Sequence, residues 1–206
     1  TFKAVRKYLT LKEEPEFDAI TRMAAFQCGV PYSIISMLDN RNQYFKSHYG
    51  TDIKKTTLEE SFCKYATQSS QELFLVEDAR QSALLKDHPL LQESEPWLFY
   101  AAISLRNESG KPFGTLAVLD HKPGALSAMQ KASLKNLAAQ AQQLVQLRAK
   151  ERELKISSNK LLRKTQRLNN IIYATQVGTW EWNVQSGEVR INERWAQMLG
   201  YTWQEL

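Results

Sequence analysis

The feature that most constrains this fold is the segment 127–173, which contains no proline and no glycine. Because these two residues are the strongest helix breakers, the segment predicts one helix far longer than the ~11–12 residues typical of globular proteins. Ser127 and Gln130 have the spacing of a capping box, which marks the start of the helix. We therefore expect a compact domain before this helix and a different module after it.

The second half of the predicted helix carries a seven-residue leucine repeat, formed by Leu147, Leu154, Leu161 and Leu168. A strict repeat of this length favours a left-handed coiled coil, and hence a homodimer through this helix. The residues four positions after each of these leucines would form the other half of the seam. They are Glu151, Ser158, Thr165 and Ile172, and only the last is apolar. Two alternatives follow. One is a parallel dimer whose imperfect seam lets two packings lie close in energy, and the other is a solvated linker helix.

Residues 16–126 show short helix and strand patterns typical of an α+β domain. Apolar residues at three-four spacing predict a helix over 16–29, and the capping-box pair Thr57 and Glu60 predicts another over 58–69. Alternating or continuous apolar runs predict strands over 32–38, 43–49, 72–77, 99–105 and 113–119. Since most consecutive strands are joined by hairpins, we expect an antiparallel sheet flanked by helices.

The stretch 78–96 is polar and interrupted by proline, and it predicts an irregular loop. Its expected hydrophobic anchors are Leu84, Leu85, Leu90 and Leu91. A loop of this length inside a compact domain is often functional.

Composition excludes several classes of function. The net charge is only +5, and no basic stripe interleaves with aromatics, so we expect no nucleic-acid partner. No apolar run approaches the ~18 residues that span a bilayer, so this segment predicts no membrane contact and a cytoplasmic location. Cys28 and Cys63 form no CxxC pair, and we expect buried reduced thiols. The three histidines are scattered, so a metal site is not supported.

Several sequence blocks, taken in order, resemble a GAF domain over residues 16–148. They are SMLDNRNQYFKS (36–47), SFC (61–63), VEDA (76–79), FYAA (99–102) and GTLAVLDHKPGALS (114–127). Leu98, Ala102 and Ala117 stand where such domains often have Arg, Gly and Cys, so the ligand does not follow from the resemblance.

The resemblance implies a sheet with the first and last helices packed on one face and a small-molecule pocket on the other. It places these residues at or near the pocket: Ser36, Phe45, Phe62, Cys63, Asp78, Phe99 and Tyr100. Each has a structural alternative. The phenylalanines also suit a plain core, Cys63 suits a small buried filler, and Asp78 suits a loop cap. Tyr100 combines apolar packing with one hydrogen bond to a ligand.

Specialised relatives of this family bind bilins or cyclic nucleotides, or reduce methionine sulfoxide. Neither cysteine precedes a histidine and the cyclic-nucleotide pattern is absent, so bilin and cyclic-nucleotide ligands are not supported. We expect no haem either. A thiol-dependent sulfoxide reductase needs activated, accessible thiols, and remains a third alternative.

The tail 176–206 has a different pattern. It predicts strands over 179–184 and 188–191 and a helix over 192–199, and it resembles the opening of a PAS domain. The rest of such a domain would normally cover Trp180, Trp182, Trp195 and Trp203. We therefore expect this tail to be poorly packed alone, or to be completed by a neighbouring chain.

The expected organisation is a helical lead-in (1–15), a GAF-like domain (16–148), a signalling helix (127–175) and a truncated PAS-like segment (176–206). The resemblance implies a non-catalytic module of a bacterial signalling protein that senses an unknown small molecule, dimerises and relays ligand state. The downstream output domain would be a diguanylate cyclase or a histidine kinase. The alternative is a ligand-free scaffold that serves only dimerisation or protein interaction.

Overall fold

The computed structural model describes residues 14–39 and 41–202. Its contacts divide the chain into two compact units, Thr1–Lys150 and Glu151–Leu206. We call them the body and the C-terminal unit, and we describe each by itself. Within the described residues, no helix is long and apolar enough to cross a membrane.

The body is built on a six-stranded sheet with the order β3-β2-β1-β6-β5-β4, in which every neighbouring pair is antiparallel. Its strands are β1 Tyr32–Leu38, β2 Asn42–Tyr49, β3 Lys55–Thr57, β4 Leu73–Val76, β5 Phe99–Arg106 and β6 Pro112–Asp120. The two central strands, β1 and β6, pair with each other, and they are the first and the last of the strands that the sequence predicts. The predicted α+β fold with an antiparallel sheet is confirmed.

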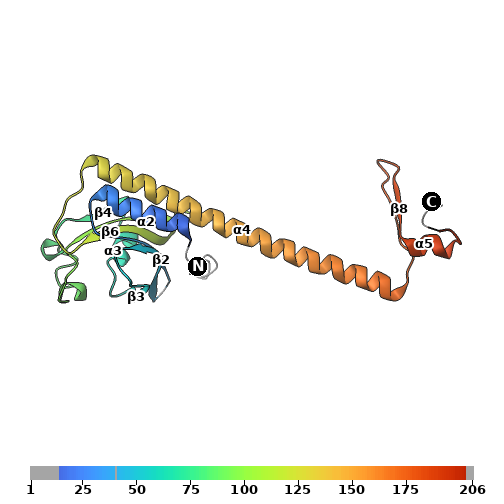
Figure 1. Cartoon of the computed structure of the whole chain (residues 1–206), viewed down its shortest axis with the longest axis horizontal. Helices are drawn as coiled ribbons and strands as arrows, with labels where there is room; N and C mark the ends of the chain where they lie inside the picture. Colours follow the sequence, from blue (N-terminus) through green and yellow to red (C-terminus); the bar gives the residue numbers. More distant parts are fainter. Residues whose placement is uncertain (1–13, 40, 203–206) are drawn as a thin grey trace. The chain divides into compact units, whose positions relative to one another are not determined.

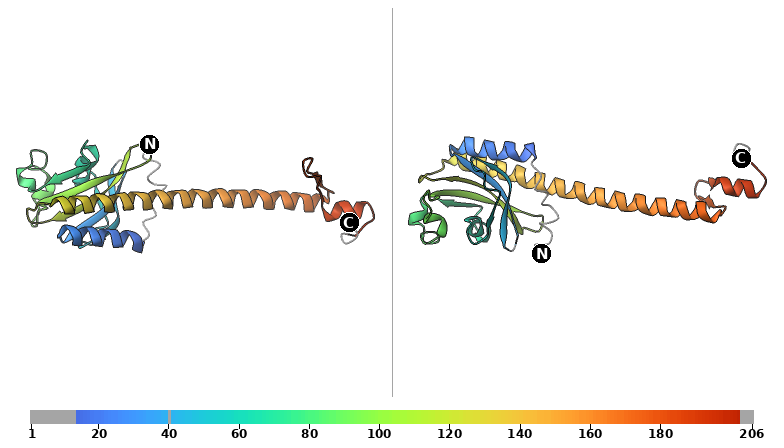
Figure 2. Two further views of the ribbon diagram at one scale, coloured as in Figure 1. Left: turned by 90° about the horizontal axis from the view of Figure 1, so that it is seen from above. Right: turned by 60° about the horizontal axis from the view of Figure 1, so that its bottom comes forward.

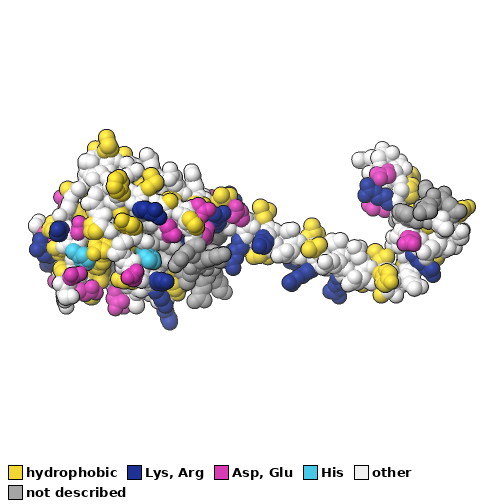
Figure 3. All heavy atoms as spheres, in the orientation of Figure 1, with side chains coloured by type: hydrophobic (Ala, Val, Ile, Leu, Met, Phe, Trp, Pro, Cys, Tyr) yellow, Lys and Arg dark blue, Asp and Glu magenta, His cyan; other side chains and the backbone are white. Residues whose placement is uncertain are grey.

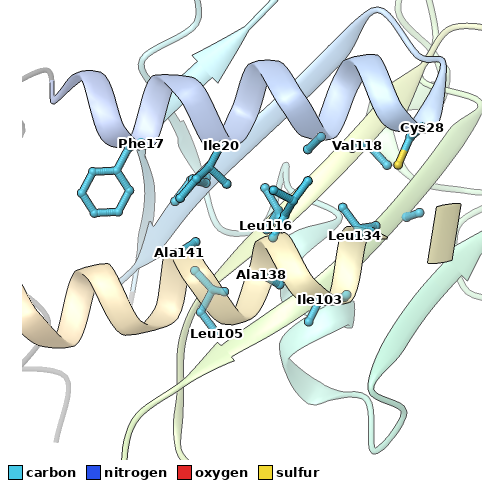
Figure 4. Close-up of a cluster of buried hydrophobic side chains, with 14 of the residues drawn as sticks. Phe17, Ile20, Cys28, Ile103, Leu105, Leu116, Val118, Leu134, Ala138 and Ala141 are labelled. Atoms are coloured by element: carbon cyan, nitrogen blue, oxygen red, sulfur yellow. The ribbon is translucent and has the colours of Figure 1, made fainter. Parts of the chain in front are cut away.

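Two helices cover one face of this sheet. Helix α2 (Pro15–Cys28) and the first part of helix α4 (Ala128–Thr175) lie side by side there, as both sets of views show (Figures 1 and 2). Their apolar sides meet strand residues such as Leu105, Leu116 and Val118 in one buried cluster (Figure 4). Because side chains of the helix layer and of the sheet interdigitate here, this cluster is the main core of the body.

Local sequence signals set the ends of both helices. Gly29 ends α2 in a left-handed conformation (φ 71°), which glycine adopts without steric cost. Ser127 and Gln130 form the predicted capping box at the start of α4, with Gln130 N–H donating to Ser127 Oγ and Ser127 N–H donating to Gln130 Oε1. The Gln130 amide also donates to the Cys28 carbonyl (2.9 Å), so it ties the two helix ends together.

The opposite face of the sheet carries α3 (Cys63–Gln68), the short 3-10 helices η1 (Ala79–Gln81) and η2 (Pro89–Leu91), and their connecting loops. These segments bury a second apolar cluster against the sheet. Two predictions fail here. The helix expected over 58–69 begins only at Cys63, and Leu84 is exposed, whereas Leu85 is fully buried.

The late start of α3 has a physical cause. Lys55–Thr57 pair with Asn42–Tyr44 as edge strand β3, so the chain cannot enter a helix at residue 58. The spacing of Thr57 and Glu60 suggested a helix start. The two residues do hydrogen-bond to each other, but the bonds close a turn instead. Sheet pairing therefore overrides the local capping signal.

The C-terminal unit contains the second part of α4, a two-stranded sheet of β7 (Trp180–Trp182) and β8 (Val189–Ile191), and α5 (Glu193–Met198). Asn192 caps α5 by accepting the Trp195 N–H at 2.9 Å. Of the described residues in this unit, only Ala196 is buried. Trp180 and Trp182 are 63% and 55% exposed, and Trp203 lies outside the described residues.

Candidate functional site

A pocket of about 80 Å³ opens on the face of the body's sheet that carries α3 and the loops. Its floor comes from β1, β2, β5 and β6, and its rim comes from the segments around residues 51–63 and 90–97. The lining residues are Ile34, Gln43, Phe45, Thr51, Ile53, Thr56, Glu60, Ser61, Phe62, Cys63, Leu90, Trp97, Tyr100, Ala117 and Leu119. An apolar pocket with a few convergent polar groups is the usual form of a small-molecule site.

The polar part of the pocket is organised around the Cys63 sulfur. Four groups donate to Cys63 Sγ: Gln43 Nε2 at 2.9 Å, Tyr100 OH at 3.1 Å, Thr115 Oγ1 at 3.1 Å and Ser36 Oγ at 3.7 Å. Ser61 Oγ donates to the Gln43 side-chain oxygen, and Cys63 N–H donates to Ser61 Oγ at 3.1 Å. The buried polar atoms of the floor are therefore hydrogen-bonded within the protein, as a stable interior requires.

Burial also determines the protonation of two groups in the body. Burial, reinforced by the neighbouring Cys63, raises the pKa of Tyr100 well above its usual value, so the phenol stays neutral and remains a donor. Burial raises the pKa of the Cys28 thiol to about 11, so this thiol stays protonated at neutral pH. Cys28 lies in the main core on the other side of the sheet, away from the pocket. It is a structural residue of that core.

Trp97 forms one wall of the pocket and is itself held by two other rings. The His121 ring stacks on the indole (centroids 4.0 Å apart, 27° between planes), and Tyr32 meets the indole edge-on at 4.8 Å. The Pro96 carbonyl lies 3.1 Å from His121 Nδ1. These contacts fix the indole in place, so the wall is preorganised.

The structure brings together four of the seven residues that the resemblance placed at a pocket. Phe45, Phe62, Cys63 and Tyr100 all line it. Ser36 lies behind this lining, where its hydroxyl contacts Cys63 Sγ at 3.7 Å and Thr115 Oγ1 at 2.9 Å.

The other two predicted residues lie elsewhere. Phe99 belongs to the main core beside α2 and α4, because successive residues of a strand point to opposite faces and Tyr100 faces the pocket. Asp78 caps η1 by accepting the Arg80 N–H at 3.0 Å, and it pairs with the Arg80 guanidinium at 2.7 Å. Phe99 is therefore a residue of the plain core and Asp78 is a loop cap, which are the structural alternatives considered for them.

Sequence reasoning missed Gln43, Thr115 and Trp97. Strand alternation contained the signal for Gln43, because it lies two residues from Phe45 on the same face of β2. Thr115 is two residues from Ala117 in β6, so the same rule applies to it. Trp97 lies in an irregular loop, where no periodicity could have found it.

A second polar cluster lies on the helix face of the sheet. Lys46 Nζ pairs with Glu14 Oε1 at 2.5 Å, and Arg148 Nε pairs with Glu14 Oε2 at 2.8 Å. Nearby, Ser47 Oγ donates to Asp18 Oδ1 at 2.6 Å. Burial alone would raise the pKa of Glu14, but the hydrogen bonds and charges of Lys46 and Arg148 outweigh it, so the pKa lies below its usual value.

The model of the GAF domain family matches residues 13–145, which is more than half of the chain. The chain belongs to the GAF domain family. Among curated proteins it is similar to a cyclic di-GMP phosphodiesterase of Pseudomonas aeruginosa, with 33% identity over 123 residues. That match covers 59% of this chain and 21% of the relative, so the chain spans about a fifth of the relative's length.

Solved structures of other proteins share the fold. The GAF domain of a phosphoenolpyruvate-protein phosphotransferase from Acinetobacter matches with a TM-score of 0.54 at 17% identity, over 69% of this chain and 88% of that one. A free methionine-R-sulfoxide reductase from Thermoplasma acidophilum matches with a TM-score of 0.52 at 16% identity, over 64% and 90%. At such identities the likeness supports the fold and not the activity.

Proposed function

We propose that this GAF-family chain is a non-catalytic sensory module that binds a small molecule in the pocket and relays its occupancy into helix α4. The observation that carries the proposal is a β-bulge in β2. Ser36 pairs with Phe45 and Ile35 pairs with Ser47, so Lys46 is the extra residue. A bulge turns a side chain away from strict alternation.

Because of the bulge, neighbouring residues of β2 reach the pocket on one face of the sheet and the helix layer on the other. Phe45 lines the pocket, whereas Lys46 and Ser47 both contact groups on the helix side. Glu14 then holds Lys46 with one carboxylate oxygen and Arg148 of α4 with the other. A ligand that displaces Phe45 would therefore disturb an ion-pair relay that ends on the signalling helix.

Dimerisation through α4 is the second part of the proposal. Leu147, Leu154, Leu161 and Leu168 are between 52% and 70% exposed in the single chain. Beyond residue 150, apolar side chains recur along α4 between Lys and Arg side chains (Figure 3). Pairing of two helices along this row would cover these leucines, as in a parallel coiled coil.

The output domain is proposed from the resemblance and the relative together. The tail from residue 176 onward, with its hairpin β7–β8 and helix α5, supports the interpretation as the start of a PAS domain. The curated relative is a cyclic di-GMP phosphodiesterase, so that activity joins the diguanylate cyclase and the histidine kinase as candidates for the downstream output.

The relay is tested by hydrogen exchange on the purified chain. Native mass spectrometry first identifies a co-purified ligand, and exchange of α4 amides near Arg148 is then compared between loaded and ligand-stripped protein. We expect a change in wild type that is lost in Glu14→Gln. The exposed Glu108→Gln, which removes a surface pair with Lys150, is the matched control. A chain that binds ligand without any change in α4 exchange would contradict the relay.

The dimer is tested separately by light scattering over a range of concentrations. Leu154→Glu and Leu161→Glu should shift the chain to monomer. Ile156→Glu introduces the same charge at an exposed apolar position outside the leucine row, so it should leave the dimer intact. Only monomers at high concentration, or equal effects of all three variants, would remove this part of the proposal.

The ligand-free scaffold remains the second candidate. The hydrogen-bonded floor of the pocket favours it, because the groups that donate to Cys63 Sγ, and Ser61 beside them, already have hydrogen-bond partners without a ligand. If the chain is such a scaffold, hydrogen exchange of the α4 amides should be the same in every protein preparation, and the chain should still form a dimer.

A further inference from the structure

We propose that the pocket selects a small aromatic molecule that is neutral or carries one positive charge, and that it rejects phosphates and carboxylates. This inference rests on the proposed sensory function and names the ligand class for the same pocket. It follows from three independent properties of the pocket: its charge, its size and its rings.

Charge is the first property. Among the described residues that line the pocket there is no Lys, Arg or His, and the one charged side chain is the carboxylate of Glu60. Protein sites for phosphate or carboxylate ligands normally supply Arg, Lys or free backbone N–H groups. An anion entering this pocket would lose its hydration and meet a like charge at the rim.

Several backbone and side-chain donors near the floor already form hydrogen bonds within the protein. Cys63 N–H donates to Ser61 Oγ, and Lys64 N–H donates to the Ser61 carbonyl at 3.4 Å. The Gln43 amide and the Tyr100 hydroxyl point to Cys63 Sγ. Turning these N–H and O–H protons toward an anion would break bonds that stabilise the fold, and none of the groups carries the charge of the missing cations.

Size is the second property. A cavity needs roughly 10–15 Å³ to hold one water molecule, so a pocket of about 80 Å³ leaves room for a small molecule only. Ile53 and Glu60 are exposed, and they let part of a ligand extend to solvent at the rim. A cavity of ~150 Å³ holds one benzene ring, so a fused ring system enters this pocket only in part, with the remainder at the open rim, whereas a base, sugar and phosphate together far exceed it.

The rings of the lining are the third property. Phe45, Phe62, Trp97 and Tyr100 all line the pocket. Phe62 and Tyr100 meet edge-on with centroids 5.4 Å apart, and His121 and Tyr32 fix the Trp97 indole. Aromatic walls favour an aromatic guest through offset or edge-on contacts, and ring faces attract cations rather than anions.

The test uses three probes that share one ring and differ in charge: indole, tryptamine and indole-3-acetate. Affinities are measured by calorimetry on the purified full chain. We expect indole and tryptamine to bind, and indole-3-acetate to bind at least about tenfold more weakly, which corresponds to ~1.4 kcal/mol. Ala117→Met fills a buried part of the lining and should abolish the binding of indole and of tryptamine. Thermal melting checks that the variant folds.

The charge preference is assigned to Glu60 by substitution. Glu60→Gln keeps an oxygen that can accept from the Thr57 hydroxyl, and it should weaken tryptamine roughly two- to fivefold while sparing indole. Glu72→Gln, an exposed carboxylate outside the pocket, should change neither affinity.

The outcomes separate this inference from the proposed function. Binding of indole-3-acetate as tight as that of tryptamine would overturn the charge preference and leave the sensor intact. Failure of all three probes to bind the folded chain would overturn the aromatic class. The expected order of affinities without any change in α4 hydrogen exchange would support the ligand class and contradict the relay.

Discussion

The body and the C-terminal unit use similar sequence patterns with opposite results. In the body, apolar residues of β1, β5 and β6 are buried between the helices on one face and α3 with the loops on the other. In the C-terminal unit, the hairpin β7–β8 has the same alternation, yet Trp180 and Trp182 stay exposed. Alternation specifies which face of a strand is apolar, but only a second layer of structure buries that face.

Helix α4 allows the sharpest form of this comparison, because it contributes leucines to both units. Leu134 is fully buried in the main core, whereas Leu161 is exposed. We expect Leu134→Ala to lower the free energy of unfolding of the body by about 3 kcal/mol, from lost burial and the cavity left behind. Leu161→Ala should change it by less than ~0.5 kcal/mol. Urea denaturation with a probe in the body measures both, and equal losses would refute the contrast.

Glycines provide the next test. A Cβ at Gly114 in β6 would overlap the Ser36 carbonyl of the neighbouring strand β1, so these central strands would have to separate. We expect Gly114→Ala to cost the body about 2 kcal/mol. In the C-terminal unit, Gly187 has φ +75° with open space around it, so Gly187→Ala should cost about 1 kcal/mol and disturb only the hairpin. Thermal melts, with amide exchange of each unit, distinguish the two effects.

The same contrast explains what the sequence could predict. The long strands and both ends of α4 followed from apolar runs, breakers and the Ser127–Gln130 capping box, since all of these signals are local. The start of α3 did not follow, because the pairing of β3 with β2 is a tertiary contact.

The candidate site was predictable in part, for a related reason. Blocks that resemble the family identified Phe45, Phe62, Cys63 and Tyr100, and strand alternation would have added Gln43 and excluded Phe99. The Trp97 wall depends on ring contacts with Tyr32 and His121, which are distant in the sequence. No pattern along the chain records such a contact.

Glu14 links α4 to β2 and offers a smaller test that depends on pH. We expect Glu14→Gln to lower the free energy of unfolding of the body by about 1 kcal/mol at pH 7, because Lys46 and Arg148 lose a charged partner. The pKa of Glu14 is lower in the folded state than its ordinary 4.5, so its contribution is present above that value.

That contribution is lost as the pH falls through the folded-state pKa, where the carboxylate becomes protonated. Wild type and Glu14→Gln should therefore converge in stability at acid pH, as denaturant titrations at several pH values would measure. A difference that persists unchanged down to the lowest pH at which both proteins still fold would mean that packing, and not charge, accounts for the effect.

The smallest expected effect is at Trp182. In the core of the body, replacing an aromatic residue by alanine would lower the free energy of unfolding by several kcal/mol. Trp182, in contrast, is 55% exposed, and only one of the described residues of the C-terminal unit is buried. Trp182→Ala should thus change unfolding of the body by less than ~0.5 kcal/mol, and amides of β7 should exchange much faster than those of β6. If a chain extended beyond residue 206 slowed exchange in β7 and made Trp182→Ala costly, a covering layer would be the missing element, because the hairpin sequence itself would be unchanged.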